Sequence, residues 1–288
     1  RCYCSAMDAP VVSLTIAGSD CCAGAGIQAD LKTFSLLGIH GLTAISTVVA
    51  QTPSQLYHHQ EVSALILKEQ IEVLLANYPV AAIKTGLLGS ATQIAIVADI
   101  LGETDLPVIV DPVLGASSGT DFGSQEVIQA YMERLLPLAH VATPNLPEAL
   151  RLLGKTDRPG PEPTSPVTIG RELTERLSIP ILLTGGHSMS ANHATDILCT
   201  IEDTREYSHA RIDLQSAHGT GCTYSSAIAG FLALGHELRE AIPKAQLLMR
   251  HVLTTSYQWP DPENGKEIRA LNQLPMATID HSQSKKLQ

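Results

Sequence analysis

The sequence predicts an α/β fold in which a mainly parallel sheet is covered by helices on both faces. Short runs of β-branched residues alternate with longer segments of helical periodicity, and the alternation continues without a reset. Motif residues stand where predicted strands end, which is where ligands gather in open α/β sheets. We therefore expect one domain over residues 11–260, preceded by a flexible extension at 1–10. A tail at 261–288 follows, and the chain after Trp259 is polar and expected to fray.

The expected elements follow from hydrophobic periodicity and from turn-forming residues. Strands are expected at 11–17, 42–50, 80–84, 108–110, 141–143 and 181–183, with an extended segment at 56–62. Helices are expected at 24–38, 64–76 and 91–101. One further helix is expected after Asn145, and another is expected to begin at the Gly-Thr-Gly turn at 219–221. Two stretches are rich in turn formers: 115–123, interpreted as a mobile lid, and 155–166, interpreted as a long surface loop.

Composition excludes several classes of protein. The chain has 288 residues, 44% of them apolar, which suffices for a large core without disulfides or metal. A formal net charge of −10 argues against a nucleic-acid or anionic-membrane surface. The six cysteines lack a paired framework, and the sequence shows neither a membrane span nor a signal peptide. We expect a cytoplasmic protein that acts on a small molecule.

The most informative segment is the run from His218 to Cys222, His-Gly-Thr-Gly-Cys. Two glycines spaced by one residue permit a tight turn, and the small-residue stretch that follows is typical of a helix. Backbone N–H groups and the positive end of a helix dipole would form an anion hole there, and the same field would favour a thiolate at Cys222. Taken alone, the run also fits a tight turn with a buried thiol.

Other strand-end residues are predicted to converge on the same crevice. They are Gly18, Gln51, Gly86 and Asp111, each at or just beyond the carboxyl end of an expected strand. The amide of Gln51 carries the donor and acceptor that recognition of an aminopyrimidine edge requires, although a polar strand-end residue is common in turns. Asn145 and Glu148 suit a metal-organising role and equally a helix capping box.

Eight segments in order resemble one known family. They are AGSD at 17–20, GAGIQADLKTFSLLG at 24–38, VAQT at 49–52, KTGLLG at 84–89, DPVL at 111–114, TPNLPEA at 143–149, GGH at 185–187 and HGTGCT at 218–223. Together they are similar to the hydroxymethylpyrimidine/phosphomethylpyrimidine kinases of thiamine biosynthesis, which are ribokinase-like and close to a group of bacterial pyridoxal kinases. The resemblance covers about residues 11–258. It implies a three-layer ribokinase-like fold, a homodimer, and the use of ATP and Mg²⁺.

The resemblance also assigns roles to matching positions. It implies that Cys222 is the catalytic base, assisted by the backbone of Gly219, Thr220 and Gly221. It also implies that Asp111 and Glu148 lie near Mg²⁺ and position the ion or its water ligands. The implied nucleotide and phosphate contacts are Asn145, Thr184, Gly186 and His218. The implied substrate pocket consists of Gln51, Gly18, Asp20, Leu87 and Val113, with Asp30 as a further candidate.

The chain departs from the family pattern where charge matters. Relatives usually carry lysine in the lid, before Gly-Gly-His and ahead of His-Gly-Thr-Gly-Cys, whereas this chain has Ser117, Thr184 and Gln215. Each charge-assisted hydrogen bond contributes about 1.5–3 kcal/mol, so the loss calls for compensation. The candidates are Lys84, His187, Arg211 or a second metal ion.

A second departure lies in the glycine-rich opening. Cys21-Cys22-Ala23 stands where proline, serine and glycine are common. Adjacent side chains point in different directions and no nearby pair has ligand spacing, so the sequence disfavours a metal site at these cysteines.

Three functions are consistent with these motif residues and with the family resemblance. The first is phosphorylation of the hydroxymethyl group of 4-amino-5-hydroxymethyl-2-methylpyrimidine, of its monophosphate, or of both. The second is a pyridoxal or pyridoxine kinase, because pyridoxal also carries a hydroxymethyl group on its ring. The third is a pyrimidine-binding protein that has lost efficient kinase activity, which the missing lysines favour.

Overall fold

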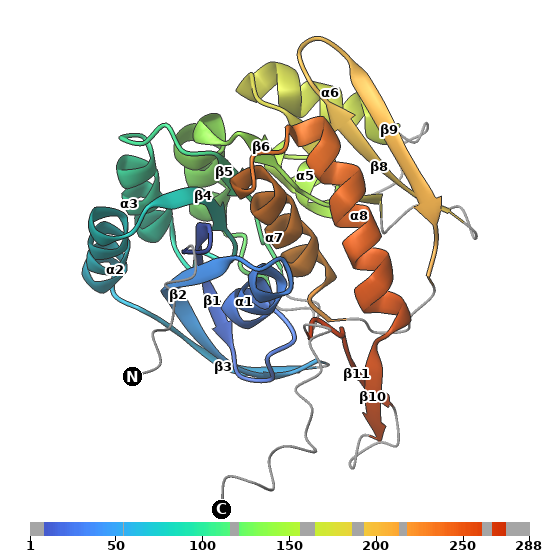
Figure 1. Ribbon diagram of the computed structural model, residues 1–288. Helices are drawn as coiled ribbons and strands as arrows, with labels where there is room; N and C mark the ends of the chain where they lie inside the picture. The colour runs from blue at the N-terminus through green and yellow to red at the C-terminus, as the bar shows by residue number, and fades with distance from the viewer. Residues whose placement is uncertain are drawn as a thin grey trace, which may run out of the picture.

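The computed structural model describes residues 9–53, 55–115, 121–155, 165–185, 193–212, 218–260 and 267–274. Its main sheet has nine strands in the order β3-β2-β1-β4-β5-β6-β7-β8-β9 (Figure 1). The strands are β1 (Val12–Asp20), β2 (His40–Thr52), β3 (Gln55–Glu61), β4 (Val80–Thr85), β5 (Val108–Val110), β6 (Val141–Ala142), β7 (Ile181–Leu183), β8 (His193–Cys199) and β9 (Thr204–Ala210).

The centre of the sheet is parallel. Strands β2, β1, β4, β5, β6 and β7 pair in parallel, whereas β3 at one edge and β8 and β9 at the other are antiparallel. The chain moves outward from β1 to β2 and then returns to β4 on the other side of β1. Strand order therefore reverses between β1 and β4, and the crevice outside such a reversal is the usual ligand site of an open α/β sheet.

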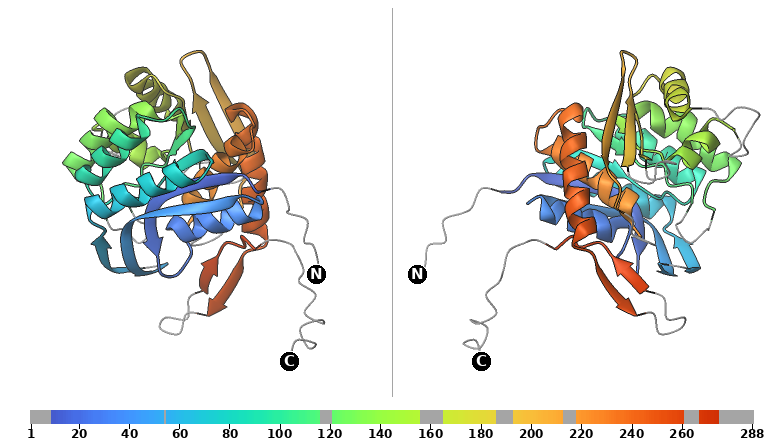
Figure 2. Two further views of the ribbon diagram at one scale, coloured as in Figure 1. Left: turned by 60° about the vertical axis from the view of Figure 1, so that its left-hand side comes forward. Right: turned by 90° about the vertical axis from the view of Figure 1, so that its right-hand side faces the viewer.

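Helices cover both faces of the sheet, as Figure 2 shows. They are α1 (Gly26–Leu36), α2 (Ala64–Asn77), α3 (Ala91–Leu101), α4 (Gln125–Ala130), α5 (Leu146–Leu152), α6 (Pro166–Leu177), α7 (Thr220–Ala233) and α8 (Leu238–Thr254), with short turns η1 (Tyr131–Leu135) and η2 (Leu136–Leu138) after α4. One core contains Leu67, Ile94 and Leu173 from α2, α3 and α6. The other contains Phe34 from α1 and Ile228 from α7. The fold class expected from the sequence is confirmed.

The end of the described chain is more ordered than its polar composition suggests. Strands β10 (Tyr257–Pro260) and β11 (Glu267–Ala270) form an antiparallel ribbon that projects from the domain (Figures 1 and 2). Beyond it Leu271 and Gln273 are buried, and Gln273 Nε2 donates a hydrogen bond to Thr223 Oγ1 in α7. Residues 267–270 therefore form an ordered ribbon, and the segment around Leu271 and Gln273 packs on the domain instead of fraying.

Some expectations fall outside the described residues: the extension at 1–8, most of the lid at 116–120, the loop at 156–164, and Ser117, Gly186, His187 and Gln215. Among the residues that are described, no helix combines the length and apolar character needed to cross a lipid bilayer.

Candidate active site

A cleft of about 720 Å³ opens at the carboxyl ends of the parallel strands. It is lined by every residue to which the family resemblance gives a catalytic, substrate, nucleotide or metal role, except the further candidate Asp30 and Gly186, which is not described. Asp30 and Gly86 do not line it. Asp30 is fully buried, and the carbonyl oxygen of Gly86 accepts a hydrogen bond from Tyr131 Oη. The topology thus brings together segments that are up to about two hundred residues apart.

The N-terminus of α7 forms one wall of the cleft. Gly219 caps this helix with a φ of +83°, a left-handed conformation that side-chain-bearing residues adopt only with strain. A Cβ at this position would also overlap the carbonyl oxygen of Gly24, so the glycine permits direct backbone packing. The first N–H groups of a helix have no partner within it and carry the positive end of its dipole. Because Thr220 and Gly221 line the cleft, these features create an anion-binding wall.

Cys222 lies in the first turn of α7, partly exposed to the cleft. Burial of the sulfur raises the pKa of the Cys222 thiol to about 12, although the nearby charge of Lys84 and a hydrogen bond from the Gly26 backbone favour the thiolate. Asp30 and Asp111 add to the increase through charge repulsion. The expectation of a favoured thiolate was wrong for the protein without ligands, because desolvation and two carboxylates outweigh the positive groups.

A prediction follows for thiol alkylation. A pKa near 12 in place of 9.0 leaves about a thousandfold less thiolate at neutral pH, so iodoacetamide should modify Cys222 slowly. Peptide mapping by mass spectrometry measures this rate, which should keep rising with pH beyond pH 10. Unfolded chain in urea provides the control. A native rate that reaches its plateau near pH 9 would contradict the raised pKa.

Two carboxyl groups line the cleft side by side: Asp111, which directly follows β5, and Glu148, in the first turn of α5. Burial raises the pKa of Asp111, and burial together with the charge of Asp111 raises the pKa of Glu148 to about 8. Ser225 Oγ donates to Asp111 Oδ2 at 2.9 Å. Paired carboxylates in a poorly solvated place favour a cation, and oxygen ligands suit Mg²⁺. The donor set therefore fits the metal that the family resemblance implies.

Glu148 also has a structural task. Its Oε2 accepts from the Asn145 N–H at 3.0 Å, while Asn145 Oδ1 accepts from the Glu148 N–H at 2.9 Å. This is a complete capping box at the start of α5, as the sequence spacing predicts. Because the capped end lines the cleft, capping and metal organisation are compatible.

A buried ion pair supports the floor of the site. Lys84 Nζ lies 3.0 and 3.1 Å from the two carboxylate oxygens of Asp30, and both side chains are fully buried. Thr15 and Ser226 hydroxyls also donate to Asp30, each at 2.6 Å. Burial would lower the pKa of Lys84, but the negative charge of Asp30 outweighs it and raises that pKa above its usual value, with smaller contributions from Cys222 and Asp111. Asp30 is thus an anchor for the cation rather than a substrate contact.

The opposite end of the cleft is polar and tightly connected. Gln51 Nε2 lies 3.3 Å from His218 Nε2, which in turn lies 3.1 Å from Asp20 Oδ2. The Asp20 carboxylate also accepts from the backbone N–H groups of Cys22, Gly24 and Ala25. Burial would raise the pKa of Asp20, but its hydrogen bonds hold the pKa well below the usual value. Asp20 therefore organises the loop at 21–25, and His218 is in contact with the residues expected to bind substrate.

The far wall of the cleft, which β8, β9 and α8 provide, was not expected from the sequence. Asp196 is its centre: its carboxylate accepts from Tyr224 Oη at 2.8 Å, Gln246 Nε2 at 2.7 Å and the Gly185 N–H at 2.7 Å. Apolar residues of α8 and the cations Arg211 and Arg250 complete this wall. No short motif marks these residues, because Asp196 meets Tyr224 and Gln246 from helices that lie 28 and 50 residues further along the chain.

Comparison with known proteins decides the family. The model of a family described as phosphomethylpyrimidine kinase matches residues 20–265. The chain belongs to the phosphomethylpyrimidine kinase family. A hydroxymethylpyrimidine/phosphomethylpyrimidine kinase of Rhizobium meliloti is 36% identical over 245 residues, which is 85% of this chain and 91% of the relative. A thiamine biosynthesis bifunctional protein of Geobacter sulfurreducens is 39% identical over 238 residues, or 81% of this chain. The match covers 47% of that longer protein.

Solved structures agree with membership of the phosphomethylpyrimidine kinase family. A phosphomethylpyrimidine kinase from Clostridium difficile matches with a TM-score of 0.71 and 33% identity, covering 83% of this chain and 98% of that one. The ADP complex of a Bacillus subtilis pyridoxal kinase matches with a TM-score of 0.77 and 31% identity, covering 91% and 98%. A Staphylococcus aureus pyridoxal kinase with AMP-PCP has a TM-score of 0.80 and 26% identity, covering 94% and 96%. These neighbours establish a ribokinase-like kinase fold.

Proposed function

We propose that this chain is an ATP- and Mg²⁺-dependent kinase that phosphorylates the hydroxymethyl group of 4-amino-5-hydroxymethyl-2-methylpyrimidine and then its monophosphate. The observation that carries the proposal is the placement of Cys222, the α7 N-terminus and Asp111 on the same cleft as Gln51, in a member of this kinase family. Phosphoryl transfer depends mainly on positioning and charge stabilisation, and the cleft offers both.

In the proposed reaction the γ-phosphoryl group of ATP lies against the N–H groups of Gly219, Thr220 and Gly221. The developing negative charge is stabilised there by donors that are already oriented. Asp111 and Glu148 would hold Mg²⁺ or its water ligands, and the ion would neutralise phosphate charge. The ring of the substrate lies toward Gln51, which places its hydroxymethyl group between the ring pocket and the phosphate site.

Cys222 is the proposed proton acceptor for the substrate hydroxyl group. A thiol with a pKa near 12 accepts no proton, so this role requires the pKa to fall when the cleft is filled. Lys84 already favours the thiolate, and its charge acts more strongly as water leaves the site. The thiol proton is first lost to solvent as the pKa falls. The hydroxyl oxygen then attacks the γ-phosphorus, its proton passes to the thiolate, and the bond between the γ-phosphorus and the bridging oxygen breaks to release ADP.

The far wall at Asp196, Gln246 and α8 is the proposed nucleoside pocket. Arg211 and Arg250 line the same end of the cleft and are the proposed replacements for the lysines absent at Ser117, Thr184 and Gln215. Lys84, the other described candidate, is held by Asp30 beneath the floor and acts on Cys222 and Asp111 instead.

Pyridoxal is the second candidate substrate, because pyridoxal kinases are among the structural neighbours. A coupled assay of ADP release with the pyrimidine and with pyridoxal separates the two. We expect kcat/KM to favour the pyrimidine by at least about tenfold. A hundredfold preference for pyridoxal, about 2.7 kcal/mol, would reverse the assignment. Binding of the pyrimidine without ADP release at saturating Mg·ATP would indicate a binding protein instead.

The proposed kinase is further expected to be a cytoplasmic homodimer. Sedimentation velocity on the purified chain measures the oligomeric state, and a monomer at micromolar concentration would contradict this expectation.

A further inference from the structure

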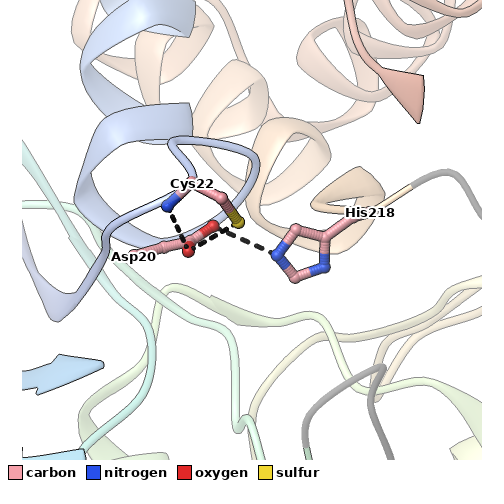
Figure 3. Close-up of side chains that lie close together, drawn as sticks. All are labelled: Asp20, Cys22 and His218. Atoms are coloured by element: carbon pink, nitrogen blue, oxygen red, sulfur yellow. Dashed lines mark hydrogen bonds and ion pairs between the residues drawn. The ribbon is translucent and has the colours of Figure 1, made fainter. Parts of the chain in front are cut away.

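Three different metal-ligand types meet at the polar end of the cleft. The carboxylate of Asp20, the thiol of Cys22 and the imidazole of His218 each offer one ligand atom, and these atoms all lie within 4.8 Å of one another (Figure 3). Cys22 Sγ is 3.0 Å from Asp20 Oδ1, and His218 Nε2 is 3.1 Å from Asp20 Oδ2. We propose that these three side chains form a binding site for a thiophilic divalent cation, with Zn²⁺ as its best-fitting occupant.

The donor set selects this class of ion. Zinc takes sulfur, nitrogen and oxygen ligands at about 2.0–2.3 Å in a tetrahedron, whose ligand atoms are therefore about 3.4 Å apart. The contacts at 3.0 and 3.1 Å, which involve the two different oxygens of Asp20, are close to this edge. The three ligand atoms lie within 4.8 Å of one another, so rotation of the exposed Cys22 side chain would draw the set together around the ion. Mg²⁺ and Ca²⁺ prefer oxygen ligands alone, which a thiol and an imidazole do not supply.

The site is largely oriented before an ion arrives. The Asp20 carboxylate is 2% exposed and is fixed by the N–H groups of Gly24 and Ala25, at 3.0 and 2.8 Å. His218 is 6% exposed, so its ring is held by packing, while Cys22 is exposed and gives the ion a route of entry. Ligands held in advance by second contacts are typical of metal sites and reduce the ordering cost of binding.

Three protein ligands leave one tetrahedral position open toward the cleft. Water would take this position, because the Gln51 amide, 3.3 Å from His218, is assigned to the ring of the substrate. Binding releases the thiol proton of Cys22 to solvent. In the metal-free site the Nε2–H of His218 donates to Asp20, so the imidazole must also move its proton to Nδ1 before Nε2 binds the ion.

A metal site at Cys21 and Cys22 is disfavoured by the sequence alone, because no pair of ligands lies nearby in the chain. The structure supplies the partner from 196 residues away, at the turn that precedes α7. Cys21 points elsewhere: its Sγ contacts the backbone of Gln51. Only one thiol of the adjacent pair therefore belongs to the cluster, which provides a matched control.

The test is a metal titration of the full chain under reducing conditions, with Cys2 and Cys4 replaced by serine to remove two other thiols. Co²⁺ serves as the spectroscopic probe. We expect one equivalent to give a thiolate-to-cobalt charge-transfer band, and one equivalent of Zn²⁺ to displace it. Cys22→Ser should abolish the band and weaken Zn²⁺ binding at least about tenfold, since even the loss of an outer-shell partner costs that much. Cys21→Ser should retain both.

His218→Gln removes a second ligand independently and should weaken Zn²⁺ binding to a similar extent, with circular dichroism confirming that each variant is folded. The absence of a cobalt band in the parent chain would overturn the proposal. A band that survives Cys22→Ser, or that is lost equally in Cys21→Ser, would also overturn it. None of these readouts depends on kinase activity, so the site and the proposed function are tested separately.

Discussion

Replacing Cys222 with alanine is expected to lower kcat by about 10²- to 10⁴-fold, the range typical of a general base. The sulfur lies in the first turn of α7 beside the proposed phosphoryl position, and no other titratable side chain is assigned the substrate proton. The Kd for Mg·ATP should change little, because the backbone N–H groups of the anion-binding wall remain.

A coupled assay gives kcat, and isothermal titration calorimetry gives the Kd. Cys222→Ser is the matched variant, because serine is similar in size to cysteine and still carries a proton donor. Its hydroxyl group is, however, much less acidic than a thiol. This variant should be nearly as inactive as the alanine variant. An unchanged kcat in either variant would remove the thiol from the mechanism.

The second large effect is expected on stability. Lys84→Met should lower the free energy of unfolding by about 3–5 kcal/mol, because it leaves the Asp30 carboxylate buried without its cation. Urea denaturation monitored by circular dichroism measures the change. The double variant Lys84→Met/Asp30→Asn should recover part of the loss, since an amide costs less to bury than an unpaired charge.

Lys68→Met is the matched control for this prediction. Lys68 forms an exposed pair with Glu72 at 3.6 Å, and such surface pairs contribute about 0–1 kcal/mol. If Lys84→Met destabilised the protein no more than Lys68→Met, the buried pair would not be an anchor of the fold.

The parallel core was predictable because its strands are continuous β-branched runs and its first helices have clear periodicity. The antiparallel strands β8 and β9 and the helix α8 were not identified from the sequence. Residues 193–210 mix polar and apolar residues without a clear alternation, because β8 is buried over most of its length whereas the edge strand β9 is largely exposed. Pro243 lies inside α8, and an internal proline argues against a helix until packing is known.

The residues of the candidate site also separate into those that the sequence predicts and those that it does not. Residues at the ends of parallel strands, such as Gln51 and Asp111, were predictable because the fold class itself places them on one crevice. Asp196 and Gln246 were missed because their pairing depends on the unrecognised strands and helix. The pKa of Cys222 was predicted in the wrong direction, since a motif reveals the helix terminus but not the depth of burial.

The proposed mechanism requires the Cys222 sulfur and the transferred phosphoryl group to lie at the same place in the cleft. A crystal structure of the chain with ADP, Mg²⁺, tetrafluoroaluminate and the pyrimidine tests this directly, because the fluoride complex mimics that group in transfer. We predict that fluoride ions of the tetrafluoroaluminate lie within about 3 Å of the N–H groups at residues 219–221. The hydroxyl group of the pyrimidine should lie between the aluminium and Cys222 Sγ. A fluoride complex bound away from the α7 N-terminus, or a pyrimidine ring remote from Gln51, would contradict the account.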